Sequence, residues 1–273
     1  MLRSDVREYY ERGGERDRLV RGATGRLEFL RTWDVLTRLL PPAPAEVVDV
    51  GGATGVYAEP LAAAGYAVTL VDPVLSHVEA AGVLPGVTAV EGDARALPLG
   101  DASADAVLLL GPLYHLPERS DRVTAWREAA RVVRPGGLVA GAVISRFASM
   151  LDGVGKGYFA EPGFAGLVEG ALVDGVHRND GNRLPWFTQA YFHRPEEVAV
   201  EAAEAGLTEV RTAAVEGPLW LTERLEDFLA DPGLTDVLLG MLRRVEHEPS
   251  LWGASSHLLT SGRRLPGAGR RAG

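Results

Sequence analysis

The chain has 273 residues, of which 46% are hydrophobic and 24% charged, a composition that suits an ordinary globular protein with a buried core. Its formal net charge of -9 argues against a nucleic-acid partner, which normally meets a clustered positive surface, and would favour a cationic ligand. The chain has no cysteine, which excludes disulfides and thiolate metal sites, and no apolar run approaches the ~18 residues that a membrane-spanning helix needs. We expect a cytoplasmic protein without membrane insertion, and the single lysine among 28 basic residues suggests a GC-rich bacterial genome.

The first 44 residues predict a helical N-terminal segment. Residues 5–22 are highly charged and carry the adjacent Tyr9 and Tyr10. This stretch is either solvated surface or a mobile lid, because amphipathic rings stand here on an element with few core-forming residues. Apolar side chains at helical spacing then predict a helix over residues 27–40, which a proline-rich stretch ends.

The stretch VVDVGGATG at residues 47–55 is the strongest local signal in the chain. Its β-branched start predicts a central parallel strand, and its glycines let the backbone bend sharply and approach a ligand at the start of a helix over residues 56–64. The next predicted strand ends in Asp72, which lies 21 residues (72 minus 51) after Gly51. That is the usual distance to a carboxylate that binds ribose hydroxyls, so the pattern predicts a nucleoside-cofactor site.

The later elements continue the alternation of strands and helices. We expect a strand that ends at Asp93, a fully buried strand at 105–110, a helix at 120–134 and a fifth strand at 138–144. Residues 146–193 are too long for a plain connection, and their aromatic content argues against disorder. Further elements are expected as a helix from Pro195, a strand at 208–215, helical structure at 225–246 and a last strand at 255–261.

The spacing of small residues separates two cofactor classes. A dinucleotide site requires G-x-G-x-x-G, and this stretch fails at two of the three glycines, which speaks against a nicotinamide oxidoreductase without removing it as an alternative. The stretch resembles the acidic-x-G-x-G-x-G turn of class I S-adenosylmethionine-dependent methyltransferases, with Asp49, Gly51, Ala53 and Gly55 at its positions and Ala53 as the departure. The segment REAARVVRPGGLVAGAVI resembles the same family before and through its fifth strand, so that the resemblance covers about residues 45–145.

The resemblance implies an α/β fold, namely a Rossmann-like, doubly wound and mostly parallel seven-stranded sheet with an antiparallel closing strand. We expect one methyltransferase domain over residues 1–262, followed by a disordered tail at 263–273. Within the domain we expect, in order, an N-terminal helical lid, a cofactor-binding core, a substrate insertion after strand five and a C-terminal part of the core, at 1–44, 45–145, 146–193 and 194–262.

The resemblance also implies the cofactor, S-adenosyl-L-methionine, and its product S-adenosyl-L-homocysteine. Asp72 would hold the ribose, and Asp93 with Ala94 would meet the adenine. Asp49 would either contact the cofactor's amino group, directly or through water, or cap backbone N–H groups of the turn. The remaining cofactor candidates are glycines at the turn and after the fourth strand, namely Gly51, Gly52, Gly55 and Gly111. Arg31 would bind the cofactor's carboxylate or form a surface ion pair.

Candidates for contact with the acceptor lie beyond the fourth strand. The GPLY stretch at 111–114 falls short of the [Asn/Asp]-Pro-Pro-[Tyr/Phe] signature of nucleic-acid amino methyltransferases, because Gly111 has no side-chain oxygen. His115 and Tyr10 are the candidate catalytic residues, with a helix-capping or core-edge role as the alternative for His115. Aromatic and imidazole side chains make up the expected substrate contacts, namely Tyr114, His177, Trp186 and His193. The histidines lack metal-ligand spacing, so no metal is indicated.

These features predict an enzyme that moves a methyl group by in-line SN2 displacement to an oxygen, nitrogen or carbon atom of a small molecule. The alternative is a protein of the same fold that binds S-adenosylmethionine without methyl transfer. We expect the insertion at 146–193 to form the acceptor chamber and the N-terminal segment with Tyr9 and Tyr10 to close it.

Overall fold

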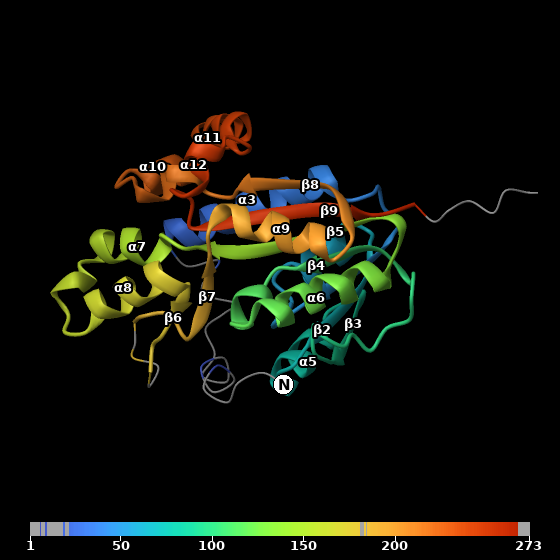
Figure 1. The fold of residues 1–273 in the computed structure, drawn as a ribbon. Coiled ribbons are helices and arrows are strands. Elements are labelled where there is room, and N and C mark those ends of the chain that lie inside the picture. The colour runs from blue at the N-terminus through green and yellow to red at the C-terminus, as the bar shows by residue number, and fades with distance from the viewer. Residues whose placement is uncertain are drawn as a thin grey trace, which may run out of the picture.

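The computed structural model describes Val6, Tyr9, Leu19, residues 22–180, Arg183 and residues 185–266. Its centre is one twisted sheet with helices on both faces (Figure 1). The main strands lie in the order β3-β2-β1-β4-β5-β9-β8, and β9 alone among them runs in the direction opposite to the others. Their bounds are β1 Glu46–Val50, β2 Ala67–Asp72, β3 Val87–Glu91, β4 Ala104–Leu109, β5 Val133–Ser145, β8 Leu207–Ala214 and β9 His257–Arg264.

Two apolar layers bury the faces of the sheet, as the β-branched strands predict. One layer packs Leu36 and Leu61 against Leu108, from helices α3 (Ala23–Leu39) and α4 (Ala58–Ala63), and includes the end of α5 (Leu75–Ala81). The opposite layer packs Trp126 and Val198 against the strands, from helices α6 (Arg119–Val132) and α9 (Pro195–Glu204). The fold is therefore the doubly wound α/β arrangement expected from the sequence.

The insertion after β5 adds structure at the carboxyl end of the sheet. It contains α7 (Ala148–Lys156), the short helix η2 (Tyr158–Ala160), α8 (Phe164–Asp174) and the strands β6 (Val176–His177) and β7 (Ala190–His193). Ile144 of β5 pairs with Phe192 on one edge and with His257 on the other, so β7 continues the sheet along the edge of β5 where β4 has ended. The seven expected strands are present, and β6 and β7 bring the described sheet to nine.

The C-terminal part forms a long link between β8 and β9. It contains η3 (Gly217–Leu221), α10 (Leu225–Ala230), α11 (Pro232–Val245) and α12 (Pro249–Trp252). Trp220, Leu229 and Leu242 from this link pack against Leu27 of α3. The link gives the chain the length to turn back, so that β9 enters antiparallel between β5 and β8.

Two strands extend several residues past their predicted ends. β5 begins at Val133 rather than 138, because Val133 pairs with Ala104 of β4, and a register shift before the Ala106–Leu138 pair accommodates the Pro-Gly-Gly stretch. β9 continues to Arg264, so the first two residues assigned to the tail belong to a strand, whereas residues 267–273 lie outside the described part. Among the described helices, none combines the length and the apolar character required to cross a membrane.

Candidate functional site

The glycine turn follows β1 at the carboxyl edge of the sheet. Gly51 has φ 71° and its N–H donates to the carbonyl of Val71 at 2.7 Å. A Cβ on Gly51 would lie 2.9 Å from Cδ of Pro112, so only glycine lets the turn lie against the loop after β4. These two loops form part of the wall of a cavity.

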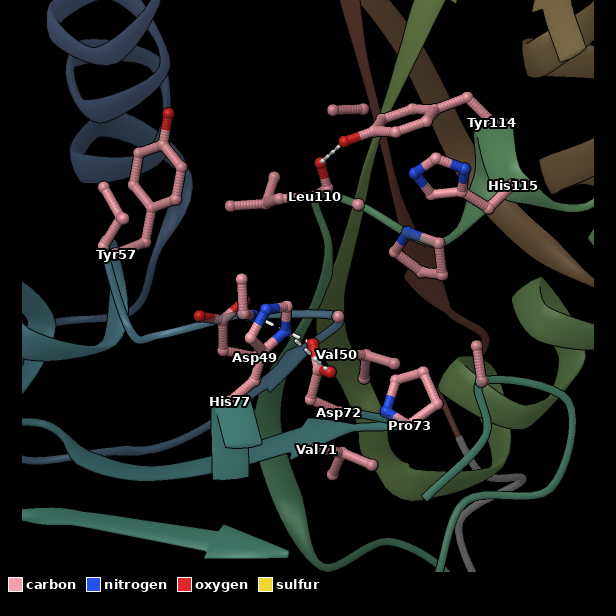
Figure 2. Close-up of a pocket in the computed structure, with 18 of the residues that line it drawn as sticks. Asp49, Val50, Tyr57, Val71, Asp72, Pro73, His77, Leu110, Tyr114 and His115 are labelled. Carbon is pink, nitrogen blue, oxygen red and sulfur yellow. Dashed lines mark hydrogen bonds and ion pairs between the residues drawn. The ribbon is translucent and has the colours of Figure 1, made fainter. Parts of the chain in front are cut away.

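The cavity is lined by the glycine turn, the ends of β2 and β3, the loop after β4 and helix α3. In Figure 2, Asp49 and Asp72 lie near the strand ends, while Tyr114 and His115 lie across the cavity from them. Of the cofactor residues expected from the sequence, those that line it are Asp49, Gly51, Gly52, Asp72, Asp93, Ala94 and Gly111. Gly55 lies behind the turn, where a Cβ would meet Leu84 at 2.5 Å.

Asp49 is fully buried below the turn. A Cβ on Gly52 would lie only 2.5 Å from its Oδ2, so the turn rests directly on the carboxyl group. Neither carboxyl oxygen has a hydrogen-bond partner among the described residues, so the capping of turn N–H groups that was the alternative role does not occur there. Burial, with the charge of Asp72 as a second cause, raises the pKa of Asp49 to about 7.

Asp72 joins three parts of the site. Its Oδ2 accepts a hydrogen bond from the N–H of Ala53 at 3.0 Å, and its Oδ1 accepts one from the N–H of Val74 at 2.9 Å. Nδ1 of His77 lies 3.1 Å from the same Oδ1 (Figure 2). A carboxylate offers about four lone pairs, so these three contacts orient Asp72 and leave acceptor capacity for a ligand. Sequence reasoning missed His77, which lies in the first turn of α5.

Asp93 is held by Arg95 on the cavity wall. Arg95 Nε donates to Oδ1 at 2.9 Å and Arg95 Nη2 to Oδ2 at 2.6 Å, while Nη1 binds Asp121 at 2.7 Å. This hydrogen-bonded guanidinium holds the pKa of Asp93 far below its usual range. Asp93 is therefore an ionised acceptor at the end of β3, and Ala94 beside it is buried in the cavity wall.

The prediction that Arg31 binds the cofactor is wrong. Its side chain is fully buried on α3 and is not part of the cavity wall. Nε donates to the carbonyl of Val215 at 3.0 Å, Nη2 donates to Glu246 at 2.8 Å, and Nη1 pairs with Asp34. The guanidinium donates its hydrogen bonds within a buried ionic network that connects α3 to the C-terminal helices, and not to a ligand or a surface partner.

A second cavity lies beside the first, and Glu28, Tyr114 and His257 line both. Aromatic rings form much of its wall, including Phe187 and Phe192 of the insertion region. Tyr9 lines it from the N-terminal segment and meets Phe187 edge-on, with ring centroids 6.0 Å apart. Tyr10, the other tyrosine of that segment, lies outside the described residues.

His115 ends the short helix η1 (Leu113–His115) and lines the first cavity. Its ring stacks on Phe187 at 6.1 Å and meets Tyr114 edge-on at 4.6 Å. Burial lowers the pKa of His115 to about 4, so the imidazole is neutral at physiological pH and a weak base.

Two predicted substrate histidines are structural instead. His177 lines neither cavity, because its ring is held between the Ser149 hydroxyl at 3.0 Å and the Phe187 carbonyl at 3.2 Å. His193 also lines neither, and its Nε2 lies 3.4 Å from the buried carboxylate of Glu201. Burial lowers the pKa of both imidazoles, to about 4 for His177.

Trp186 is likewise absent from both cavity walls. It packs against Phe164 with ring centroids 5.2 Å apart and carries Arg183 over its face at 4.3 Å. Its large apolar ring fills the core of the insertion, so its assignment to the substrate site is wrong.

Sequence reasoning missed one cluster where the two cavities meet. Ligand atoms of Glu28, Glu216 and His257 lie within 4.8 Å of one another, the only such group of three histidine or acidic residues found in the described part of the chain. His257 Nδ1 lies 2.6 Å from Glu216 Oε1, so this nitrogen is engaged by a hydrogen bond rather than turned toward a metal ion. The three residues come from distant parts of the chain, and no sequence spacing reveals them.

Comparison with known proteins identifies the domain. Residues 48–141 match the family model described as "Methyltransferase domain". Residues 48–141 therefore form a methyltransferase domain, in agreement with the resemblance of this part of the sequence to class I S-adenosylmethionine-dependent methyltransferases. This match covers β1 to β5, the part that carries the glycine turn, Asp72 and Asp93.

Relatives share the same segment. An uncharacterised methyltransferase of Mycobacterium tuberculosis is 38% identical over 100 residues, which are 36% of this chain and 40% of the relative. A ubiquinone/menaquinone biosynthesis C-methyltransferase of Rubrivivax gelatinosus is 37% identical over 100 residues, 36% of this chain and 38% of the relative. The match therefore spans about two fifths of these curated relatives.

The fold as a whole also has solved counterparts. A structure described as a SAM-dependent methyltransferase of Methanosarcina mazei superposes with a TM-score of 0.56 at 16% sequence identity and covers 85% of this chain and 97% of its own. At this identity the likeness concerns the fold alone.

Proposed function

We propose that this protein binds S-adenosylmethionine and transfers its methyl group to a small-molecule acceptor. The observation that carries the proposal is Asp49, a fully buried carboxyl group whose two oxygens have no partner among the described residues. Burial of such a group without hydrogen bonds is unfavourable, and a ligand that donates hydrogen bonds to it offsets this cost. The amino group of the cofactor supplies donors and a positive charge, directly or through water.

The other residues of the first cavity fit the same ligand. Asp72 is oriented by three hydrogen bonds and keeps acceptor capacity for ribose hydroxyls. Asp93 and Ala94 stand at the end of the next strand, where an adenine would lie. Bound S-adenosylmethionine supplies an electrophilic methyl group on a sulfonium ion, and the protein's main contribution is alignment, which can be worth ~7 to 11 kcal/mol.

We assign the acceptor to the second cavity. It shares Glu28, Tyr114 and His257 with the cofactor cavity, so a molecule bound there would lie next to the cofactor. Its walls carry aromatic rings, which suit a small ligand, and the chain's negative charge disfavours nucleic acid. In this assignment residues 45–145 bind the cofactor, residues 146–193 shape the chamber, and the N-terminal segment with Tyr9 closes it.

Transfer of an isotope tests this function against the alternative, binding without methyl transfer. The protein is incubated with methyl-labelled S-adenosylmethionine and a bacterial metabolite extract, and products are detected by mass spectrometry. We expect a new labelled small molecule, and less of it with the Asp49→Asn variant at a limiting concentration of the cofactor. Tight binding of the cofactor with no label transferred to any metabolite would favour the alternative.

A further inference from the structure

Three distant segments meet at the boundary between the two cavities. Glu28 comes from α3, Glu216 immediately precedes η3, and His257 is the first residue of β9. Glu28 and His257 line both cavities, and Glu216 lines the second. The cluster therefore stands where a bound acceptor would face the cofactor.

Glu216 fixes the orientation of the imidazole. Its side chain is 2% exposed, and its Oε2 accepts hydrogen bonds from the Ser255 hydroxyl and from the backbone N–H of His257, both at 2.9 Å. Its Oε1 lies 2.6 Å from Nδ1 of His257. An ionised carboxylate only accepts, so Nδ1 carries the proton and Nε2 is the basic nitrogen of the neutral ring. This pair of a base and an orienting carboxylate is the arrangement used for proton transfer.

Among the described residues, the charged groups nearest this pair are carboxylates. Glu28 Oε2 lies 3.8 Å from His257 Nδ1, so two carboxylates flank one imidazole. Asp152 and Lys156, which also line the second cavity, pair with each other at 2.9 Å and offset each other's charge. Aromatic rings of Tyr9, Phe187 and Phe192 complete the wall. Carboxylates and ring faces together favour a cation over a neutral or anionic group.

We propose that the acceptor is an amine that enters as an ammonium ion, and that His257 is the base that takes its proton. Glu216 is then the positioning residue that sets the tautomer, and Glu28 supplies charge to bind the ammonium. This inference rests on the proposed methyl-transfer function and assigns its acceptor class.

The proton and electron balance is simple. One ammonium proton moves to Nε2 of His257, and the lone pair that remains on nitrogen forms the bond to the methyl carbon. The carbon–sulfur bond breaks with its electron pair left on sulfur, which becomes a neutral thioether. The product is an N-methylammonium ion, and the imidazolium formed on His257 is stabilised by Glu216 and Glu28. Two positive charges are present before the step and two after it.

Binding of matched probes tests the acceptor class. Calorimetry first measures S-adenosylhomocysteine binding, and then phenethylamine, phenethyl alcohol, butylamine and butanol are titrated into that complex. We expect each amine to bind at least about tenfold more tightly than its alcohol, a difference of about 1.4 kcal/mol. Glu28→Gln should abolish the preference, while the exposed Glu223→Gln, the same charge change outside the cavities, should keep it.

The outcomes of this experiment are separable. Failure of S-adenosylhomocysteine to bind would contradict the proposed function. Normal binding of S-adenosylhomocysteine, with alcohols bound as tightly as amines or with the preference intact in Glu28→Gln, would overturn only the amine assignment.

Nitrogen NMR tests the role of the pair without turnover. In the complex with S-adenosylhomocysteine, the His257 signal, assigned by its loss in His257→Gln, should show a proton on Nδ1 and none on Nε2, and Glu216→Gln should shift the tautomer population. A proton on Nε2 in the unmodified protein would refute the base assignment. With the amine that binds most tightly and labelled S-adenosylmethionine, His257→Gln should slow a single turnover by about 10² to 10⁴-fold. No transfer to any bound amine, or an unchanged rate in the variant, would also refute it.

Discussion

The backbone N–H of Ala53 donates a hydrogen bond of 3.0 Å to the carboxylate of Asp72. This contact joins the glycine turn after β1 to the acidic residue at the end of β2, so the two halves of the nucleoside site are oriented together. Ala53 reaches the contact with φ 48°, in the left-handed region that costs an L-residue roughly 1 to 2 kcal/mol. The residue that departs from the family's glycine pattern is therefore held in a conformation that glycine adopts readily.

Replacing Ala53 by glycine should stabilise the protein. Relief of the left-handed strain lowers the free energy of the folded state by more than the extra conformational entropy of glycine lowers that of the unfolded chain. The free energy of unfolding should therefore increase by about 0.5 to 1 kcal/mol. Urea unfolding measures this gain, and S-adenosylhomocysteine affinity should be kept or improved. Ala199→Gly, inside helix α9, is the control and should lose about 1 kcal/mol. A destabilised Ala53→Gly would show that the methyl group packs favourably in the turn.

Gly52→Ala should damage both stability and binding. The added Cβ would lie 2.5 Å from Oδ2 of Asp49 and 2.7 Å from Cδ1 of Leu70, two side chains that pack directly beneath the turn. Overpacking of this kind costs about 1 to 3 kcal/mol, and the displaced Asp49 should weaken S-adenosylhomocysteine binding. Gly240→Ala in α11, with no atom within 4 Å of the added Cβ, should instead gain about 0.5 to 1 kcal/mol. Equal changes in stability and in S-adenosylhomocysteine affinity in the two variants would contradict the packing of Gly52 on Asp49.

The buried Asp49 should make stability fall as the pH rises. Its pKa is raised to about 7 in the folded protein, whereas the unfolded chain releases this proton near pH 3.9. Its contribution to stability is therefore fully present below about pH 4 and lost as the pH rises to about 7. His115 and His177, whose pKa values are lowered to about 4, act in the opposite sense below pH 6.5, so a variant must isolate Asp49.

The informative quantity is the difference between Asp49→Asn and the unmodified protein. The free energy of unfolding of the variant, relative to that of the unmodified protein, should rise by on the order of 2 kcal/mol between pH 4.5 and 7.5. Asp236→Asn, on an exposed side chain, should show no such trend. A difference independent of pH would mean that Asp49 is ionised throughout this range.

Arg31 should matter for stability and not for cofactor binding. Arg31→Met leaves the buried carboxylates of Asp34 and Glu246 short of a partner, and breaking such a pair typically costs about 3 to 5 kcal/mol. Arg26→Met, whose partner Glu226 is exposed, should cost under about 1 kcal/mol. Thermal unfolding and calorimetry separate the two effects. Weaker S-adenosylhomocysteine binding in a fully stable Arg31→Met would restore the original assignment.

Those parts of the fold and the site that depend on local sequence pattern and on strand topology could be predicted from the sequence. The β-branched run before Gly51 and the apolar strand before Asp72 define two adjacent parallel strands, and the carboxyl ends of such strands meet at one edge, so the turn and Asp72 could be placed together. The doubly wound order was implied by the resemblance to the methyltransferase family. Periodicity alone did not reveal the β6–β7 extension, because β6 has only two residues.

Partners distant in the chain could not be predicted. The stripe on α3 showed that Arg31 lies near a buried face, but its partner Glu246 lies 215 residues further on. The same holds for Glu216 and His257, which only the return of β9 brings together. His177 and His193 illustrate the converse, because a histidine in an aromatic segment looks the same in sequence whether it faces a ligand or is satisfied in the core.

Calorimetry of S-adenosylhomocysteine with the unmodified protein and with Asp49→Asn tests the central claim most directly. Asparagine keeps the shape of the side chain and breaks no hydrogen bond that the described structure shows for Asp49, so a change in affinity reports on the ligand rather than on the fold. We predict binding at one site, weakened at least about tenfold, or 1.4 kcal/mol, by Asp49→Asn and unaltered by Asp236→Asn. No binding to the unmodified protein, or equal affinity in Asp49→Asn, would contradict the assignment of this cavity to the cofactor.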